Sequence, residues 1–77
     1  MTRWELMERI CEITREATGA ALSETESLKE SGLDSLALVT VIAGIEERFG
    51  FFFRDDDLDP ERLTTLEALA EITEKYI

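Results

Sequence analysis

Residues 31–36 read SGLDSL, between a polar stretch, ALSETESLKE at 21–30, and an apolar run, ALVTVIAGIEERFG at 37–50. The order places a serine, Ser35, directly after Asp34, whose side chain is of the type that caps helices. The apolar run that follows has the spacing of a helix. The stretch therefore predicts the start of a helix with a serine in its first turn.

The pattern after Asp34 predicts a helix from Ser35 to about Phe49. Apolar residues recur at Leu38, Ile42, Ile45 and Phe49, and the stripe is widened by Leu36, Val39 and Val41. Gly50 follows in the position where glycine ends helices. Because the stripe covers most of the circumference, we expect neighbouring elements to enclose this helix as the central one of the fold.

A first helix is predicted from Thr2 to about Thr18, with Gly19 as its C-terminal stop. Its stripe consists of Leu6, Ile10, Ile13 and Ala17, flanked by Trp4, Met7 and Cys11, all of which we expect in the core. Residues 20–34 have no helical or strand period and predict a long loop. The leucines of this loop are expected to pack back onto the helices.

Two further helical segments are predicted towards the C-terminus. Asp59 followed by Pro60 indicates a short helix over 61–63. Thr64 with Glu67 three residues later forms a capping box for a last helix that continues to the C-terminus. The fold class is therefore all-α, a small four-helix bundle of three main helices and one short helix with a long loop between the first two.

The three consecutive aromatics Phe51, Phe52 and Phe53 leave two alternatives open. An extended backbone would turn Phe51 and Phe53 inward and Phe52 outward, as an anchor for a partner or a second copy. An irregular loop would bury all three. Phe52→Ser should cost little stability in the first case and about 3 kcal/mol or more in the second.

Composition narrows the class of protein. The 77 residues suit one domain over 1–77, and 18 acidic against 8 basic residues give a formal charge of −10, which disfavours nucleic acid and anionic membranes. No apolar run is long enough to span a bilayer. The single cysteine suits a reducing compartment. We expect a cytoplasmic monomer whose partners are basic. A free-standing protein is favoured, and an excised domain of a larger synthase is the alternative.

Catalysis and metal binding are not expected. The chain has no histidine, so Ser35 would lack its usual base as a nucleophile, and a small hydrolase is disfavoured. Asp55, Asp57 and Asp59 resemble the start of a calcium loop, but Pro60 stands where glycine is needed. We therefore expect no enzyme and no metal site.

The start of the helix at Ser35 suits an anion. Unpaired N–H groups and the helix dipole would favour a negative charge attached to Ser35. Gly32 permits a tight backbone path, and the leucines beside the serine are expected to be buried. The alternative is a simple helix cap in which Ser35 is incidental.

The order of these features resembles the acyl carrier and peptidyl carrier proteins over essentially the whole chain. The resemblance is carried by Gly32-Leu33-Asp34-Ser35-Leu36, by a central helix ending Ile45-Glu46-Glu47-Arg48-Phe49-Gly50, and by a final helix opening at Thr64-Thr65. It implies a 4′-phosphopantetheine arm on Ser35, with Gly32, Asp34 and Leu36 completing the site. The arm would come from coenzyme A through a magnesium-dependent phosphopantetheinyl transferase and hold acyl or aminoacyl groups as thioesters.

Departures from the fatty-acid carriers point to a specialised pathway. Ala37, Thr40 and Ala43 replace acidic residues, although Glu46 and Glu47 remain as expected contacts for a basic partner. Residues 55–64 form a longer segment, similar to that of discrete aminoacyl and D-alanyl carriers. We expect a discrete type II carrier of polyketide, nonribosomal peptide or related secondary-metabolite synthesis.

The expected partners are a loading enzyme, either an adenylating enzyme or an acyltransferase, and downstream synthase enzymes. The alternatives are a D-alanyl or other aminoacyl carrier, a fatty-acid carrier and, more remotely, an unmodified helical interaction module.

Overall fold

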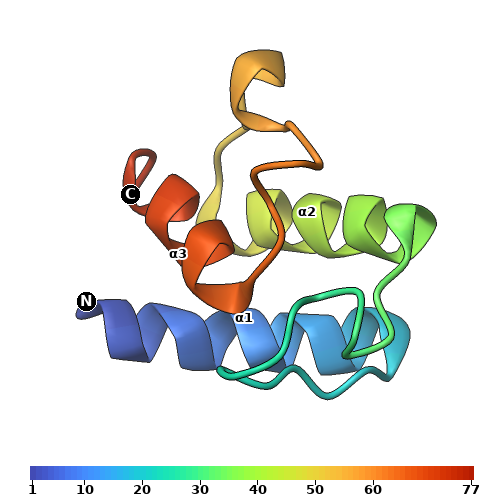
Figure 1. The fold of residues 1–77 in the computed structure, drawn as a ribbon. Coiled ribbons are helices and arrows are strands. Elements are labelled where there is room, and N and C mark those ends of the chain that lie inside the picture. Colours follow the sequence, from blue (N-terminus) through green and yellow to red (C-terminus); the bar gives the residue numbers. More distant parts are fainter.

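The computed structural model describes all 77 residues and contains no strand. Its elements are α1 (Arg3–Thr18), α2 (Ser35–Phe49), the 3₁₀ helix η1 (Asp55–Asp57) and α3 (Leu66–Glu74) (Figure 1). The first and last residues lie at the same side of the molecule (Figure 1). The all-α prediction is confirmed, with three main helices. No helix combines the length and the apolar character that crossing a membrane requires.

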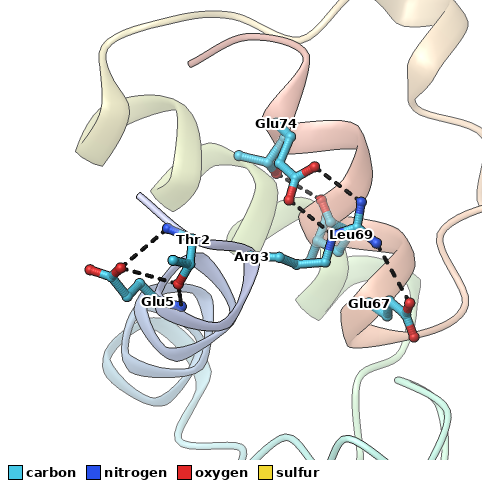
Figure 2. Close-up of polar contacts among 7 residues, drawn as sticks. Thr2, Arg3, Glu5, Glu67, Leu69 and Glu74 are labelled. Atoms are coloured by element: carbon cyan, nitrogen blue, oxygen red, sulfur yellow. Dashed lines mark hydrogen bonds and ion pairs between the residues drawn. The ribbon is translucent and has the colours of Figure 1, made fainter.

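The start of α1 is fixed by a capping box. The Thr2 hydroxyl accepts a hydrogen bond from the Glu5 N–H at 3.1 Å, and the Glu5 carboxylate accepts one from the Thr2 N–H at 3.2 Å (Figure 2). These bonds lower the pKa of Glu5. Gly19, with φ of 78°, ends the helix as expected.

Arg3 joins the start of α1 to α3. Its guanidinium donates two hydrogen bonds to the Glu74 carboxylate, at 2.9 and 3.1 Å, and lies 3.6 Å from the Glu67 carboxylate (Figure 2). The bidentate contact lowers the pKa of Glu74 and raises that of Arg3. Because these side chains are partly exposed, the ion pairs contribute little to the free energy of folding. Their main effect is to fix the orientation of α1 relative to α3.

The prediction that the helix beginning at Ser35 is the central element was wrong. α1 packs against both α2 and α3, whereas α2 buries only Val41 and Ile45 completely. Leu36 and Val39 are 77% and 62% exposed. α1 is the helix that packs against α2, so part of the apolar circumference of α2 stays exposed. The width of the apolar stripe does not tell which part that is.

α1 and α2 approach each other closely at Gly44. A Cβ atom added there would lie 2.7 Å from Cγ2 of Ile13, which is buried on α1. The absence of a side chain at Gly44 therefore sets the distance between the two helices. This contact holds the middle of α2 against α1. The two ends of α2 are held by contacts with other segments.

The segment before α3 differs from the prediction in two places. Asp59 accepts from the N–H groups of Glu61, Arg62 and Leu63, but these bonds close a single turn rather than a short helix. The short helix is instead η1, over Asp55–Asp57. The hydrogen bonds that begin at Asp59 span a single turn, and a segment this short does not gain enough further bonds to continue as a helix.

The last helix is capped by Thr65 and not by Thr64, and it ends at Glu74 rather than at the C-terminus. The Thr65 hydroxyl accepts from the Ala68 N–H at 3.0 Å, while the Thr64 carbonyl accepts from the Leu28 N–H. A pairing with the long loop therefore decides which threonine is the cap.

The stripe of α1 and its flanking residues were expected in the core on spacing alone. Ala17 is exposed, so that expectation was wrong for it; α2 approaches α1 at Ile13, one turn earlier. Trp4 is 57% exposed, so its assignment to the core was also wrong; it lies two residues before the buried Leu6, which places it on the opposite face of α1. Met7 and Cys11 are half-buried and pack against the core. Burial raises the pKa of the Cys11 thiol, which keeps it protonated and unreactive.

Candidate functional site

The long loop between α1 and α2 is held by the segment that precedes α3. The Leu28 N–H donates to the Thr64 carbonyl at 2.8 Å, and Ser27 and Thr65 form an isolated antiparallel bridge. Leu28 and Leu33 are buried in the core, as expected for the leucines of this loop. The loop is thus tied to the bundle by its backbone and by its apolar side chains.

A tight turn brings the loop to the start of α2. The Ser27 N–H donates to the Glu30 carboxylate at 2.9 Å, and the Glu30 N–H donates to the Ser27 hydroxyl at 3.1 Å. The first of these bonds is the main cause of the lowered pKa of Glu30. Gly32 follows with φ of 97°, a conformation that favours glycine, as the prediction required.

Asp34 caps α2, as predicted, and Ser35 is the first residue of the helix. The Asp34 carboxylate accepts from the Ala37 N–H at 2.8 Å. The N–H groups of Ser35 and Leu36 have no partner within the helix and carry the positive end of its dipole. No acidic side chain lies in the first turn, so the Asp34 carboxylate, which binds the Ala37 N–H, is the one negative group at the start of the helix.

Ser35 differs from the other serines of the chain. Ser23, Ser27 and Ser31 are half-buried, whereas Ser35 is exposed. Among the half-buried ones, Ser23 and Ser27 already use their hydroxyls in local hydrogen bonds. Among the serines, Ser35 is therefore the one most accessible to another enzyme.

A cleft of about 520 Å³ opens beside Ser35. It is lined by the turn at Gly32–Ser35, by Leu38 of α2, and by Pro60, Leu63 and Thr64 from the segment before α3; Ser27, Leu28 and Lys29 complete it. Its apolar lining consists mainly of leucines, and its polar lining residues are Ser27, Lys29, Asp34, Ser35 and Thr64. The cleft suits a small flexible ligand with both apolar and hydrogen-bonding groups.

Three of the four predicted site residues lie together in this cleft. Gly32, Asp34 and Ser35 line it, but Leu36 points to solvent, so the expectation that both leucines beside the serine are buried held only for Leu33. Lys29 and Thr64 were missed. Thr64 reaches the cleft through the loop pairing, for which no local sequence signal exists.

The opposite end of α2 carries the aromatic residues. Phe51 stacks on Tyr76 with 4.9 Å between ring centroids, and Phe53 meets both rings edge to face at 4.8 and 5.2 Å. Phe53 is buried and Phe51 half-buried, while Phe52 is 85% exposed. The outward orientation of Phe52 is confirmed, and burial of all three is wrong.

Glu46 has a structural role that the sequence did not reveal. Its carboxylate accepts a hydrogen bond from the Phe53 N–H at 2.8 Å, whereas Glu47 is exposed and makes no ion pair. The two glutamates are therefore not equivalent. Of the expected contacts for a basic partner, only Glu47 is free.

Groups needed for independent catalysis are not assembled around Ser35. The titratable side chains that line its cleft are Lys29 and Asp34, and the Asp34 carboxylate already caps α2. The structure contains no group of three or more His, Cys, Asp or Glu side chains arranged to hold a metal ion.

Comparison with solved structures gives the same fold. The crystal structure of an acyl carrier protein from Thermotoga maritima matches with a TM-score of 0.80 and 25% identity, over 95% of this chain and 87% of that one. A chain in the structure of Bradyrhizobium japonicum glycine:[carrier protein] ligase complexed with glycylated carrier protein matches with a TM-score of 0.68 and 22% identity, over 91% and 96%. No curated protein matches in sequence.

The sequence profile of the phosphopantetheine attachment site matches residues 5–72, which is nearly the whole chain. Proteins with this domain carry acyl or aminoacyl groups on a covalently attached 4′-phosphopantetheine, work with other enzymes and catalyse nothing themselves. The exposed serine at a capped helix start and the cleft beside it fit such an arm. The chain belongs to the phosphopantetheine attachment site family of carrier proteins.

Proposed function

We propose that Ser35 is the residue that carries the 4′-phosphopantetheine arm. The observation that supports this is its position: an exposed hydroxyl in the first turn of α2, next to the Asp34 cap and at the mouth of a cleft. A phosphodiester on its Oγ would meet unpaired N–H groups and the positive end of the helix dipole. Gly32 and Asp34 shape the turn around the phosphate, and Leu36 contacts the enzymes that approach the arm.

The cleft gives the arm a place to lie. Its polar residues Ser27, Lys29 and Thr64 suit the amides of pantetheine, and Leu33, Leu38 and Leu63 suit its methyl groups. The cargo thioester at the end of the arm would extend beyond these residues to the enzymes that load and remove it. The chain itself supplies the attachment point and the orientation of the arm.

The pathway we propose is synthesis of a polyketide, a nonribosomal peptide or a related secondary metabolite, with the protein acting in the cytoplasm as a monomer. Residues 35–45 contain no charged side chain, and Leu36 and Val39 are exposed there. An enzyme that recognises a strongly acidic helix face would find little to bind. A fatty-acid carrier is therefore a weaker alternative.

An aminoacyl group is the second candidate cargo. The likeness to a carrier protein that is glycylated by its ligase supports this class, in agreement with the resemblance of residues 55–64 to aminoacyl and D-alanyl carriers. The partner would then be an adenylating ligase rather than an acyltransferase. Both cargoes use the same arm and the same serine.

The test of the attachment site is intact mass spectrometry after incubation with coenzyme A, Mg²⁺ and a promiscuous phosphopantetheinyl transferase. The wild-type chain should gain the mass of one arm, and Ser35→Ala should gain none. Ser31→Ala is the matched control, because Ser31 lies in the same turn but is half-buried, and it should be modified like the wild type. Modification of Ser35→Ala would refute the assignment.

Cargo class is tested on the modified protein. Adenylating enzymes and acyltransferases from the source organism would each be offered the holo chain with their labelled substrates. Transfer of an amino acid supports the aminoacyl carrier, and transfer of a carboxylic acid supports the polyketide or fatty-acid alternatives. A wild-type chain that takes up no arm at all would instead favour the unmodified interaction module.

A further inference from the structure

Phe52 is an exposed aromatic side chain on a rigid support. The Phe51 N–H donates to the Glu46 carbonyl at 3.2 Å, and the Arg54 N–H donates to the Tyr76 hydroxyl at 3.0 Å. Together with the bond from Phe53 to the Glu46 side chain, these contacts fix the backbone on both sides of Phe52. The rings of its two neighbours are packed against Tyr76. The direction in which Phe52 points is therefore set before any partner arrives.

A side chain held in this way is suited to binding. Phenylalanine brings a large apolar area to an interface, and aromatic anchors are frequent at interface centres. Ordering a flexible segment opposes binding, and here the folded chain has already ordered it. At 85% exposure, the ring contributes almost nothing to the core of its own protein. Its presence on this turn is not explained by the stability of the fold.

We propose that Phe52 is the anchor of a docking surface for an enzyme that loads or unloads the arm. The anchor would enter an apolar pocket on the enzyme, and basic side chains would surround that pocket. The proposal rests on the carrier function proposed above. It adds a contact site at the opposite end of α2 from Ser35.

The charges around Phe52 favour a basic enzyme over a second copy of the chain. The segment 47–57 around Phe52 has four acidic residues, Glu47, Asp55, Asp56 and Asp57, and two basic ones, Arg48 and Arg54. Arg48 already pairs with Glu16, and Asp57 with Lys75. A second copy would bring the same acidic residues and the same net charge of −10 to the interface. Like charges brought together oppose binding, whereas a basic rim would attract this surface over a distance of about one Debye length.

The position of Phe52 predicts which kinetic constant depends on it. α2 has 15 residues, so Ser35 and Phe52 are separated by a length on the order of 20 Å. A contact this far from the thioester holds the carrier but does not touch the reacting atoms. Loss of Phe52 should therefore raise KM for the carrier and leave kcat unchanged.

The experiment compares wild type, Phe52→Ala and Trp4→Ala as substrates of the adenylating enzyme or acyltransferase that loads the holo wild-type chain. Trp4 is the matched control, an exposed aromatic on α1. Intact mass first establishes that all three accept the arm to the same extent, so a failure of the proposed attachment at Ser35 is seen separately. Steady-state loading is then measured against carrier concentration, and sedimentation equilibrium reports self-association.

The proposal requires that Phe52→Ala raise KM about tenfold or more with kcat within about twofold, while Trp4→Ala behaves like the wild type. Raising NaCl from about 50 to about 500 mM should also raise the KM of the wild type, because the rim is charged. An unchanged KM for Phe52→Ala would overturn the proposal. So would a dimer of the wild type that Phe52→Ala abolishes without any effect on loading, since the occupant would then be a second copy.

Discussion

The two ends of α2 are built in opposite ways. At its start, one carboxylate caps the helix, Ser35 and Leu36 face solvent, and the first eleven residues are uncharged. At its end, Gly50 turns the chain into a cluster of aromatic rings, and Arg48 pairs with Glu16 of α1 at 3.4 Å. The start is left free for attachment, whereas the end is packed and presents a single fixed side chain.

The difference shows where along α2 the contacts that stabilise the fold are placed. The middle of α2 is anchored on α1 through Val41, Gly44 and Ile45, and the end is anchored through Phe53. At the start, the Asp34 side chain caps the helix, and Ser35 and Leu36 are exposed. Substitutions along the helix should therefore differ in cost according to their position.

The largest expected effect separates the two neighbouring phenylalanines. Phe53→Ala should lower the free energy of unfolding by about 3–5 kcal/mol, because it empties a buried site between Phe51 and Tyr76. Phe52→Ala should lower it by less than about 0.5 kcal/mol. Urea unfolding followed by circular dichroism measures both losses. Similar losses at the two positions would contradict the burial of Phe53 and the exposure of Phe52.

A second substitution tests the anchor in the middle of the helix. Gly44→Ala should cost about 1–3 kcal/mol, because the new methyl group meets Ile13 in a packed interface and outweighs the gain in helix propensity. In the background of Ile13→Ala the same substitution should cost much less. A double-mutant cycle by urea unfolding measures this coupling. Additive effects would mean that the two side chains do not meet.

The cap at the start of α2 should give a smaller effect. Asp34→Ala removes the acceptor of the Ala37 N–H bond and should cost about 1 kcal/mol, whereas Asp34→Asn keeps an acceptor and should change stability by only a few tenths. Thermal melts of the two variants at neutral pH make the comparison. Equal losses would indicate that the charge of Asp34 matters more than its hydrogen bond.

The smallest effect concerns the hydrogen bond that the Tyr76 hydroxyl donates to the Asp57 carboxylate. This bond is the main cause of the lowered pKa of Asp57, with Lys75 adding a weaker attraction. A lowered pKa in the folded state stabilises the fold above the unfolded value of about 3.9, and that contribution is lost as pH falls through the folded value. Tyr76→Phe should therefore be less stable than the wild type at about pH 6.

The difference between Tyr76→Phe and the wild type should shrink as the pH falls below the unfolded value of about 3.9 and through the lower pKa that Asp57 has in the folded state. Urea midpoints at several pH values from about pH 6 down to about pH 2 measure it. Lys75→Met separates the weaker contribution of the ion pair. A difference that stays constant over the whole range would mean that the hydroxyl acts through packing and not through the Asp57 carboxylate.

Signals that lie within a few residues of each other predicted the fold well. The caps at Asp34, Gly19 and Gly50 are local, because each depends on the backbone of its own helix end. The fold class and the position of Ser35 follow from such patterns. For Phe52 the local pattern left two alternatives open, and the packing of Phe51 and Phe53 on the distant Tyr76 decides between them.

What the sequence did not reveal depends on segments far apart in the chain. Leu36 and Val39 continue an apolar stripe, but only the placement of α1 and α3 decides that they stay exposed. Thr64 and Thr65 are equally good caps until Leu28 takes the Thr64 carbonyl. Glu46 looks like any surface glutamate until the turn after α2 brings the Phe53 N–H to it.

The bond from Leu28 to Thr64 ties the presentation of Ser35 to the order in which the chain is synthesised. A nascent chain leaves the ribosome N-terminus first, so Ser35 emerges while Thr64 and α3 are still to be made. Until α3 packs against α1, the core is incomplete. The Leu28 N–H has no Thr64 carbonyl to bind during this time, so the loop before Ser35 is not held in place. A phosphopantetheinyl transferase that recognises the folded turn would thus modify finished carriers and pass over incomplete ones.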